Sequence, residues 1–350
     1  MASLSPPLTA EQQRWLTQVQ DVATFRMKWL ADASWKTART AMLAYILMCI
    51  HFGLDPVPPT GIPDIYLSAF ILFLVQDKKA FSTIKTYLSM GPRVLQLLHL
   101  GTWTQISDRP TVLQSLRAAR RVLGDTTKHK IAITPTILLA FHALLDFNDP
   151  EAVVLYTAFL VAFWGFLRKS NVVVGRRSET NAQAALKRSS ISVDSTGRMW
   201  LELTRTKTIH FQERKLVIPM PHLPNQPELC ASTWLLRCLA LDPLASSDTL
   251  LFSVPGRNAR GQVTRTPLTY SRFVAVLKRL LTLTGHDASG YAGQSFRRGG
   301  ATFAHASGVS AEFIKLHGDW RSNAYQLYTG VSTATQLAAI QRMSAALSRS

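Results

Sequence analysis

Apolar residues recur at helical spacing along the first third of the chain. Between Glu11 and Leu30 they are three and four residues apart, which predicts an amphipathic helix. A serine hydroxyl can accept a bond from the free N–H groups of a helix start, so Ser34 and Ser82 are predicted caps. With residues 1–10 as a flexible lead-in, the pattern predicts a compact helical domain over residues 11–125. Its further helices are expected at residues 34–52, 62–76, from 81 onward, and 111–123.

A polar, basic stretch without apolar periodicity follows, and we place an interdomain linker at residues 126–132. The second domain, 133–350, begins with Thr134 as a cap and Pro135 at the first helical position. Two helices are expected next, at 135–146 and 150–168. The apolar run in the second helix is shorter than the roughly 20 residues that span a bilayer, which predicts a buried core helix.

The pattern then changes to short segments rich in β-branched residues. Residues 191–193, 199–203 and 215–218 predict a small antiparallel sheet of about three strands, with residues 204–214 at the exposed end of its last hairpin. Helical spacing returns afterwards. The expected helices lie at residues 230–241, 271–284, 294–307, 311–316 and, at the C-terminus, 333–348.

Charge changes the picture more than hydropathy does. The 350 residues include 39 Lys plus Arg and 21 Asp plus Glu, a net charge of +18. Residues 1–130 hold 15 basic and 8 acidic side chains, and residues 131–350 hold 24 and 13, so the excess is spread over both domains. This balance favours a polyanionic partner, nucleic acid first and an anionic membrane surface second.

The cysteines and the N-terminus argue against a disulfide-stabilised, a metal-binding or a secreted protein. The three cysteines, Cys49, Cys230 and Cys238, have neither a disulfide framework nor metal-ligand spacing, and buried thiols are expected. No basic segment followed by an apolar one begins the chain, so we expect no secretory signal and an intracellular protein.

Several basic residues of the first domain are predicted to lie next to helix starts. Free N–H groups there bind phosphate, and a nearby cation adds charge. Taken singly, each is equally explained as part of a solvated face; as a set they favour DNA binding. These candidates are Lys36, Arg39, Lys85, Arg117, Arg120 and Arg121, with Arg298 added from the second domain.

The second domain carries candidates for chemistry. Arg168 ends an apolar helix, where it would bind a buried phosphate or cap the helix C-terminus. Lys207, at the predicted hairpin tip, is either a mobile general acid or a solvated turn lysine. Arg297 and Arg298 follow Ser295, a cap-type residue, which would place a guanidinium near a helix start.

Aromatic residues follow these arginines. Trp320 is either a donor to a phosphate oxygen through its indole N–H or a core residue. Tyr325 and Tyr328 are three residues apart, near one helix face, and such tyrosines are ordinarily core or interface residues.

As an ordered set, these residues resemble the tyrosine recombinase (phage integrase) superfamily. The most specific pieces are Gln-Ser-Phe-Arg-Arg-Gly-Gly-Ala-Thr at 294–302 and Gly-Asp-Trp-Arg-Ser-Asn-Ala-Tyr-Gln-Leu-Tyr at 318–328. The second resembles recombinases of Crypton and DIRS eukaryotic mobile elements. The resemblance covers essentially the whole chain from about Trp35. It implies a multidomain, mainly α fold: an all-helical, SAM-like core-binding domain and an α+β catalytic domain with a small antiparallel sheet.

The resemblance also implies roles. Arg168 and Arg297 would hold the non-bridging oxygens of a scissile phosphate, and Lys207 would protonate the leaving 5′ oxygen. Trp320 would hydrogen-bond the phosphate, and Tyr328 would be the nucleophile that forms a 3′-phosphotyrosyl link. We prefer Tyr328 to Tyr325 because its spacing from Trp320 matches the family.

Two positions depart from the family pattern. Gln294 fills the place of a histidine, and glutamine can donate to a phosphate oxygen but cannot take a proton from tyrosine. Asn171 stands where an acidic residue is common. His317 is close in sequence to Trp320 but off the motif.

The expected function is a site-specific recombinase that cuts and rejoins DNA without metal, nucleotide or other cofactor. The alternatives are a weakened or inactive DNA-binding protein on the same fold, or relaxation of DNA in the manner of a type IB topoisomerase. The expected partners are double-stranded DNA and further copies of the chain, in a dimer or tetramer on DNA, with no membrane. The C-terminal helix is a candidate for docking on a neighbouring copy. The chain would be DNA-associated, in the nucleus if the host is eukaryotic.

Overall fold

A computed structural model describes residues 14, 29–30, 32–98, 103–124, 130–176, 184–209 and 213–327. The chain divides into two compact units, Met1–Lys128 and His129–Ser350. In the described residues no helix is both long and apolar enough to cross a bilayer. The predicted helix over residues 11–30 and the C-terminal helix lie almost entirely outside the described residues.

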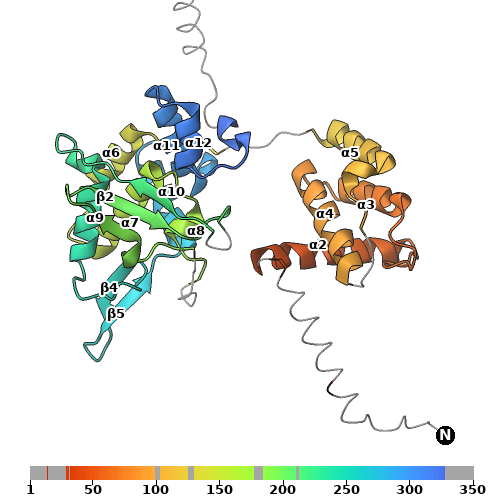
Figure 1. Cartoon of the computed structure of the whole chain (residues 1–350), viewed down its shortest axis with the longest axis horizontal. Helices are drawn as coiled ribbons and strands as arrows, with labels where there is room; N and C mark the ends of the chain where they lie inside the picture. The colour runs from red at the N-terminus through yellow and green to blue at the C-terminus, as the bar shows by residue number, and fades with distance from the viewer. Residues whose placement is uncertain are drawn as a thin grey trace, which may run out of the picture. The chain divides into compact units, whose positions relative to one another are not determined.

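The first unit is helical (Figure 1). Its described helices are α2 (Asp32–His51), α3 (Asp64–Gln76), α4 (Phe81–Leu98) and α5 (Pro110–Leu123). Their apolar faces enclose one core that includes Tyr45 and Phe70, whose rings meet edge to face at 5.3 Å. Helices α2 and α4 approach closely at Gly91. A Cβ at this position would lie only 2.6 Å from the Ala41 carbonyl oxygen, so the contact requires glycine.

The helix positions were predicted well, but two predicted caps are wrong. Helix α2 begins at Asp32 and α4 at Phe81, so Ser34 and Ser82 lie inside the helices. The first turn of α4 is bonded to the Ala80 carbonyl, which accepts from Thr83 and Ile84. A cap-type residue near an apolar run therefore located each helix to within two residues without locating its first residue.

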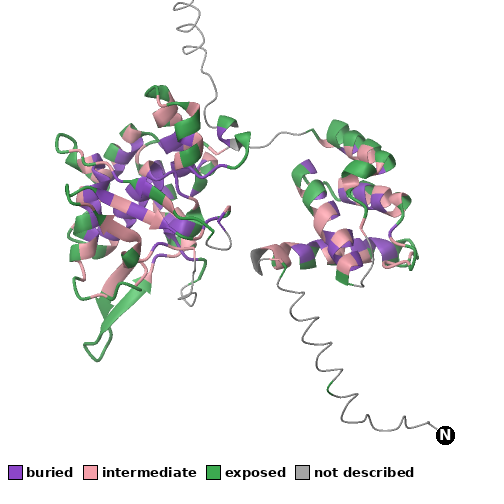
Figure 2. Ribbon diagram, viewed as in Figure 1, coloured by how far each residue is buried: buried purple, intermediate pink, exposed green. Residues whose placement is uncertain are grey.

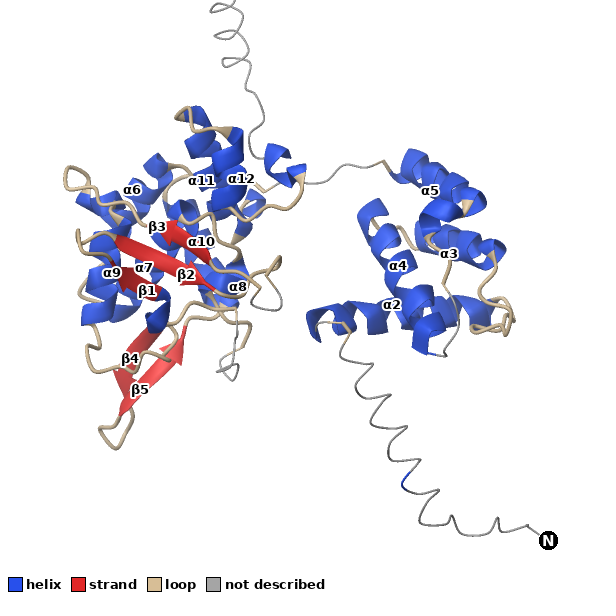
Figure 3. Cartoon of the chain, viewed as in Figure 1, coloured by secondary structure: helices blue, strands red, loops and turns tan. Residues whose placement is uncertain are grey.

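The second unit packs helices around a small sheet (Figure 3). Its helices are α6 (Pro135–Leu144), α7 (Pro150–Trp164), α8 (Lys169–Val172), α9 (Ala231–Ala240), α10 (Tyr270–Leu283), α11 (Gln294–Ala306) and α12 (Ala311–His317). Thr134 caps α6 as predicted, accepting from the Ile137 N–H. Helix α7 is buried on every side from residue 152 to 163, which confirms the core helix (Figure 2).

The predicted three-stranded sheet is confirmed. Strands β1 (Ile191–Val193), β2 (Met199–Leu203) and β3 (Leu216–Pro219) pair antiparallel in that order. Alternate residues of β2 are buried, so one face of this strand covers the core. A second hairpin, β4 (Ser253–Arg257) and β5 (Val263–Pro267), was not predicted and extends from the body of the unit with mostly exposed residues.

A small satellite cluster lies where α11, α12 and the end of α7 meet. It consists of Phe166, Ala301, Ile314, Trp320 and Tyr325. Helix α11 packs closely on α7 at Gly300. A Cβ at this position would lie only 2.0 Å from the Phe163 carbonyl oxygen, so the contact requires glycine. This close approach brings the segments that carry Arg168, Arg297 and Trp320 together.

Candidate active site

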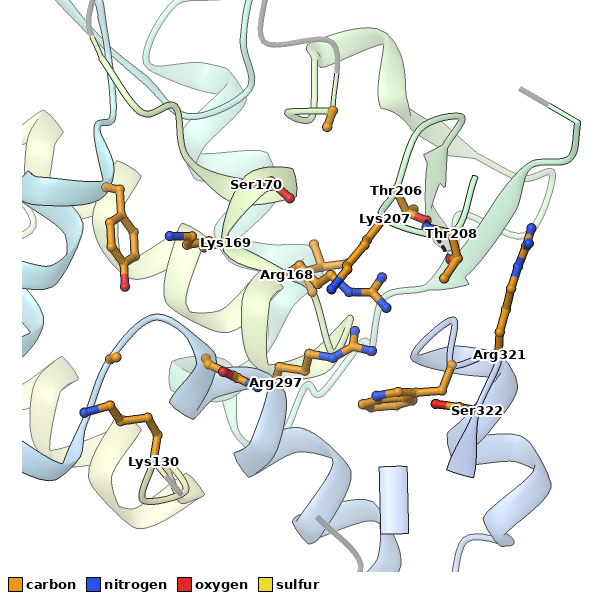
Figure 4. Close-up of a pocket in the computed structure, with 16 residues that line it drawn as sticks. Lys130, Arg168, Lys169, Ser170, Thr206, Lys207, Thr208, Arg297, Arg321 and Ser322 are labelled. Carbon is orange, nitrogen blue, oxygen red and sulfur yellow. Dashed lines mark hydrogen bonds between the residues drawn. The ribbon is translucent and has the colours of Figure 1, made fainter. Parts of the chain in front are cut away.

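Five of the six predicted catalytic residues line one pocket of the second unit, about 920 Å³ in volume (Figure 4). They are Arg168, Lys207, Gln294, Arg297 and Trp320. They come from four segments that are distant in sequence, after α7, after β2, on α11 and after α12. The sixth, Tyr328, lies outside the described residues, which end at Leu327.

The lining of this pocket is basic. Within the described part of the chain it includes six basic side chains and no carboxylate: Lys130, Arg168, Lys169, Lys207, Arg297 and Arg321. Lys130, Lys169 and Arg321 were not predicted, although Lys169 and Arg321 directly follow residues that were. A concave site with this charge favours an anionic ligand.

Arg168 reaches the pocket because α7 ends earlier than predicted. The helix stops at Trp164, and Phe166 adopts φ +46°, so the chain leaves the helical path before Arg168. The capping role predicted as an alternative for Arg168 is therefore wrong. Its guanidinium instead donates to the Asp319 carbonyl oxygen at 3.2 Å and lies 3.5 Å from that residue's carboxylate.

Arg297 is held from several sides. Its side chain is 4% exposed, and its terminal nitrogens donate to the carbonyls of Phe166 and, at 2.6 Å, Gly318. Its guanidinium carbon lies 3.7 Å from the centre of the Trp320 ring, in cation–π geometry. Ser295 is not the helix cap that we predicted, because α11 begins one residue before it.

Trp320 belongs both to the core and to the pocket, so its two predicted roles are compatible. It is 8% exposed and packs with Phe166 and Tyr325, yet it also lines the pocket. Glycine is required at Gly318, since a Cβ there would lie 1.7 Å from the Trp320 ring.

Lys207 lies on a tight turn four residues beyond the end of β2. The Thr206 N–H donates to the Ile209 carbonyl at 3.1 Å, and the Thr206 hydroxyl accepts from the N–H groups of Thr208 and Ile209. Lys207 itself is exposed and points over the pocket beside Arg168 (Figure 4). A hydrogen-bonded turn with an exposed lysine side chain suits a residue that delivers a proton.

Asp319 was missed by the sequence analysis, yet it is the most heavily bonded carboxylate near the site. Its side chain accepts from Thr206 at 2.5 Å, from Thr208 and from Arg214. Burial alone would raise the pKa of this carboxyl, but the bonds from Thr206, Thr208 and Arg214 outweigh burial and lower it. Asp319 is therefore ionised at neutral pH.

Asn171 explains one departure from the family pattern. Its side-chain amide donates to the carbonyls of Ala184 at 2.9 Å and Arg205 at 3.1 Å, and the residue is 2% exposed. An ionised carboxylate has no donor and could make neither bond. In this chain the position three residues after Arg168 therefore ties α8 to the segment that precedes Lys207.

His317 and Tyr325 do not line the pocket. The His317 Nε2 lies 2.8 Å from the Trp164 carbonyl, to which it donates, and its ring packs against Phe166. Burial lowers the pKa of His317, and the charge of Arg297 lowers it further, so the ring is neutral at pH 7. Tyr325 is 9% exposed within the satellite cluster, as the core interpretation of this residue predicts.

The predicted DNA-binding residues of the first unit are all exposed. Four of them do not lie next to a helix start as predicted. Arg39 and Arg117 are each the eighth residue of their helices, and Arg120 and Arg121 lie in the last turn of α5. These four arginines would act through their own charge and not with a helix N-terminus. Arg298 is partly buried and does not line the pocket. Among the residues that the structure describes, no group of three or more His, Cys, Asp or Glu could hold a metal ion.

Comparison with solved structures identifies the fold. A lambda integrase dimer bound to a COC′ core site matches at TM-score 0.55 and 16% identity, covering 91% of this chain and 94% of that one. The Tn1549 transposon integrase in complex with transposon right end DNA matches at TM-score 0.54 and 15% identity, covering 92% and 98%. The chain has the integrase fold. No family model and no curated protein sequence matches it.

The fold class predicted from sequence is therefore confirmed, as a mainly helical chain with small antiparallel sheets in the integrase arrangement. The coverage includes both units, since more than nine-tenths of the chain is matched. At 15 to 16% identity the match concerns the fold, and the residues of the pocket must carry the argument for function.

Proposed function

We propose that this protein is a site-specific DNA recombinase of the tyrosine type, which cuts and rejoins DNA through a 3′-phosphotyrosyl intermediate. One observation carries the proposal. On an integrase fold, six basic side chains and, within the described residues, no carboxylate line the pocket that also holds Gln294 and Trp320. Such a site suits a phosphodiester whose negative charge increases in the transition state.

The proposed reaction is a transesterification. The Tyr328 oxygen attacks the scissile phosphorus, a P–O bond to tyrosine forms, and the P–O5′ bond breaks with its electron pair passing to O5′. A proton from the Lys207 ammonium then neutralises the leaving oxygen. The phosphotyrosyl bond retains the energy of the broken phosphodiester, so a 5′ hydroxyl can reverse the step and rejoin the DNA.

The two arginines would contribute differently. Arg297 is fixed by two carbonyls and the Trp320 ring, so its charge is oriented before the substrate binds. Arg168 bonds to Asp319 and stays partly exposed, which suits contact with an entering phosphate.

Gln294 lines the pocket but cannot serve as a base. In the proposed mechanism it donates to a phosphate oxygen, and the proton of Tyr328 passes to solvent. Because Gln294 cannot act as a base, the alternative function is that of a catalytically inactive DNA-binding protein on the same fold.

The wider proposal concerns partners. Double-stranded DNA is the substrate, and paired sites require assembly of several copies; the lambda integrase that shares the fold is a dimer on its core site. We further propose a Crypton- or DIRS-type origin from residues 318–328, and nuclear location in a eukaryotic host. Docking of residues 333–348 on a neighbouring copy is part of the same proposal.

The test is covalent capture. Randomly nicked genomic DNA of the source organism is incubated with the protein, the mixture is denatured, and DNA that stays attached is sequenced. Wild type should retain fragments that share one end sequence, and Tyr328→Phe and Arg297→Ala should retain none. Fragments without a shared end would favour a topoisomerase, and no attachment by wild type would favour the inactive rival.

Gln294→His should increase attachment at pH 7 if a missing base limits the rate.

A further inference from the structure

Asp319 occupies a backbone position that usually belongs to glycine. Helix α12 ends with the Asp319 N–H bonded to the Leu316 carbonyl and the Trp320 N–H bonded to the Lys315 carbonyl, each at 3.0 Å. This is a Schellman ending, and its left-handed residue is Asp319 at φ +55°. A residue with a Cβ is strained there, so the choice of aspartate needs a reason in its side chain.

The carboxylate of Asp319 binds both sides of the β2–β3 hairpin end. Thr206 and Thr208 follow β2, and Arg214 precedes β3; all three donate to this one side chain, which is 2% exposed. A single buried charge thus connects the end of α12 to two segments of the hairpin.

The two threonines flank Lys207. Thr206 also organises the turn, because its hydroxyl accepts from two backbone N–H groups while donating to Asp319. Whatever fixes Thr206 therefore fixes the backbone from which the Lys207 side chain extends over the pocket.

Arg168 depends less on this carboxylate. Its 3.2 Å bond is to the Asp319 backbone carbonyl, which every residue type retains, whereas the distance to the carboxylate is 3.5 Å. Removing the side chain would therefore release the turn of Lys207 before it released Arg168.

We propose that Asp319 is a positioning residue, whose carboxylate anchors residues 206–209 so that the Lys207 ammonium faces the leaving 5′ oxygen. The proposal rests on the proposed function, in which Lys207 is the general acid. Ionisation of Asp319 at neutral pH agrees with this role, since an ionised carboxylate can accept from all three donors and forms stronger hydrogen bonds than a neutral acid.

The backbone geometry supplies a clean variant. Asp319→Gly removes the carboxylate and relieves the left-handed strain, so helix α12 keeps its ending. Thr206→Val removes the main partner from the other side. Glu213→Gln is the matched control, since Glu213 pairs with Arg321 at 3.1 Å on an exposed contact between the same two segments.

The substrate is the nicked duplex recovered by covalent capture, made with either oxygen or sulfur at the scissile 5′ position. A thiolate leaves without protonation, so loss of the general acid harms only the oxygen substrate. Asp319→Gly, Thr206→Val and the benchmark Lys207→Ala should cleave the oxygen substrate about 100-fold more slowly. With sulfur, each should come within about threefold of wild type, and Glu213→Gln should match wild type on both.

Binding and hydrogen exchange separate positioning from general damage. Affinity for a duplex of about 30 base pairs should be unchanged or higher in Asp319→Gly, since a negative charge is removed beside a basic pocket. Amide exchange should accelerate in residues 204–209 and not in α11. Equal slowing on both substrates, or unchanged exchange in the turn, would overturn the proposal. If wild type cleaves neither substrate, the proposed function fails, and the exchange measurement alone decides whether Asp319 anchors the turn.

Discussion

At the scale of single residues, the pocket depends on how its guanidiniums are held. Arg297 is buried, and it makes two directional bonds and one stacking contact at once. A lysine carries the same charge on a single nitrogen and cannot form that set of contacts. The geometry therefore makes the shape of the Arg297 side chain as important as its charge.

Arg297→Lys should reduce the rate of covalent attachment by roughly 100-fold or more while changing DNA affinity little, because charge is kept and orientation is lost. Single-turnover cleavage and a binding titration measure the two effects. Arg198→Lys, on the exposed turn between β1 and β2, is the control and should be neutral. A cleavage rate for Arg297→Lys equal to wild type would show that orientation is unimportant.

Single residues also show which parts of the site could be predicted from the sequence. Arg168, Lys207, Arg297 and Trp320 were predicted to act together, and they share one pocket. Asp319 could not be found in this way, because a carboxylate near a basic site has no local signal. Its partners are more than 100 positions away in sequence, and only the folded chain brings them close.

At the scale of elements, close helix packing sets the distances in the site. Gly300 lets α11 approach α7, and a Cβ at this position would meet the Phe163 carbonyl and the Phe166 ring. Because Arg297 is on α11 and Phe166 leads to Arg168, separation of these helices would displace both arginines.

Gly300→Ala should therefore destabilise the second unit by roughly 3 kcal/mol, as expected for overpacking against backbone. Gly256→Ala is the matched control, since its nearest neighbour would be a side-chain oxygen at 3.4 Å on the exposed hairpin. Chemical denaturation measures the difference in free energy of unfolding. Similar values for the two variants would mean that α11 can move without cost.

His317, whose ring contacts the end of α7, should make the stability of the second unit depend on pH. Burial holds its folded-state pKa below the ordinary value of 6.5, so the unfolded chain binds the proton more readily. The stability that this residue contributes is complete above pH 6.5 and is lost as pH falls toward the lowered folded-state pKa.

His317→Gln keeps a donor for the Trp164 carbonyl and does not titrate. Wild type should lose more free energy of unfolding than this variant between about pH 7.5 and 5.5, measured by denaturant titration at each pH. Parallel losses would contradict a neutral, buried His317.

The elements that the sequence missed have physical reasons. Strands β4 and β5 contain proline and glycine in an exposed, arginine-rich stretch that is typical of a loop, and their pairing alone makes them strands. The early end of α7 depends on the left-handed Phe166, which composition does not indicate. Thr134 was predicted because its proline at the next position fixes the helix start.

At the scale of the whole molecule, the fold and the distribution of charge are two separate observations. The order of helices and strands was sufficient to predict the fold class, which the match to solved integrases confirms. The excess of +18 is spread over both units, so each should contribute to binding a polyanion.

The salt dependence of DNA affinity tests whether the positive charge of the first unit contacts DNA. Replacing Arg117, Arg120 and Arg121 together by alanine should reduce the slope of log affinity against log salt by about 3, because each arginine would neutralise one phosphate. Lys79→Ala is the control, because Lys79 already pairs with Asp77 at 3.0 Å. An unchanged slope in the triple variant would remove α5 from the DNA interface.

The proposed mechanism requires that Tyr328 become covalently joined to DNA. Trypsin should release residues 322–342 as one peptide that contains both Tyr325 and Tyr328, so fragmentation of the captured adduct can distinguish them. A nucleotide should be attached through a phosphodiester at Tyr328, and Tyr325 should be unmodified. An adduct on Tyr325 or on any other residue, or no adduct from wild-type protein, would contradict it.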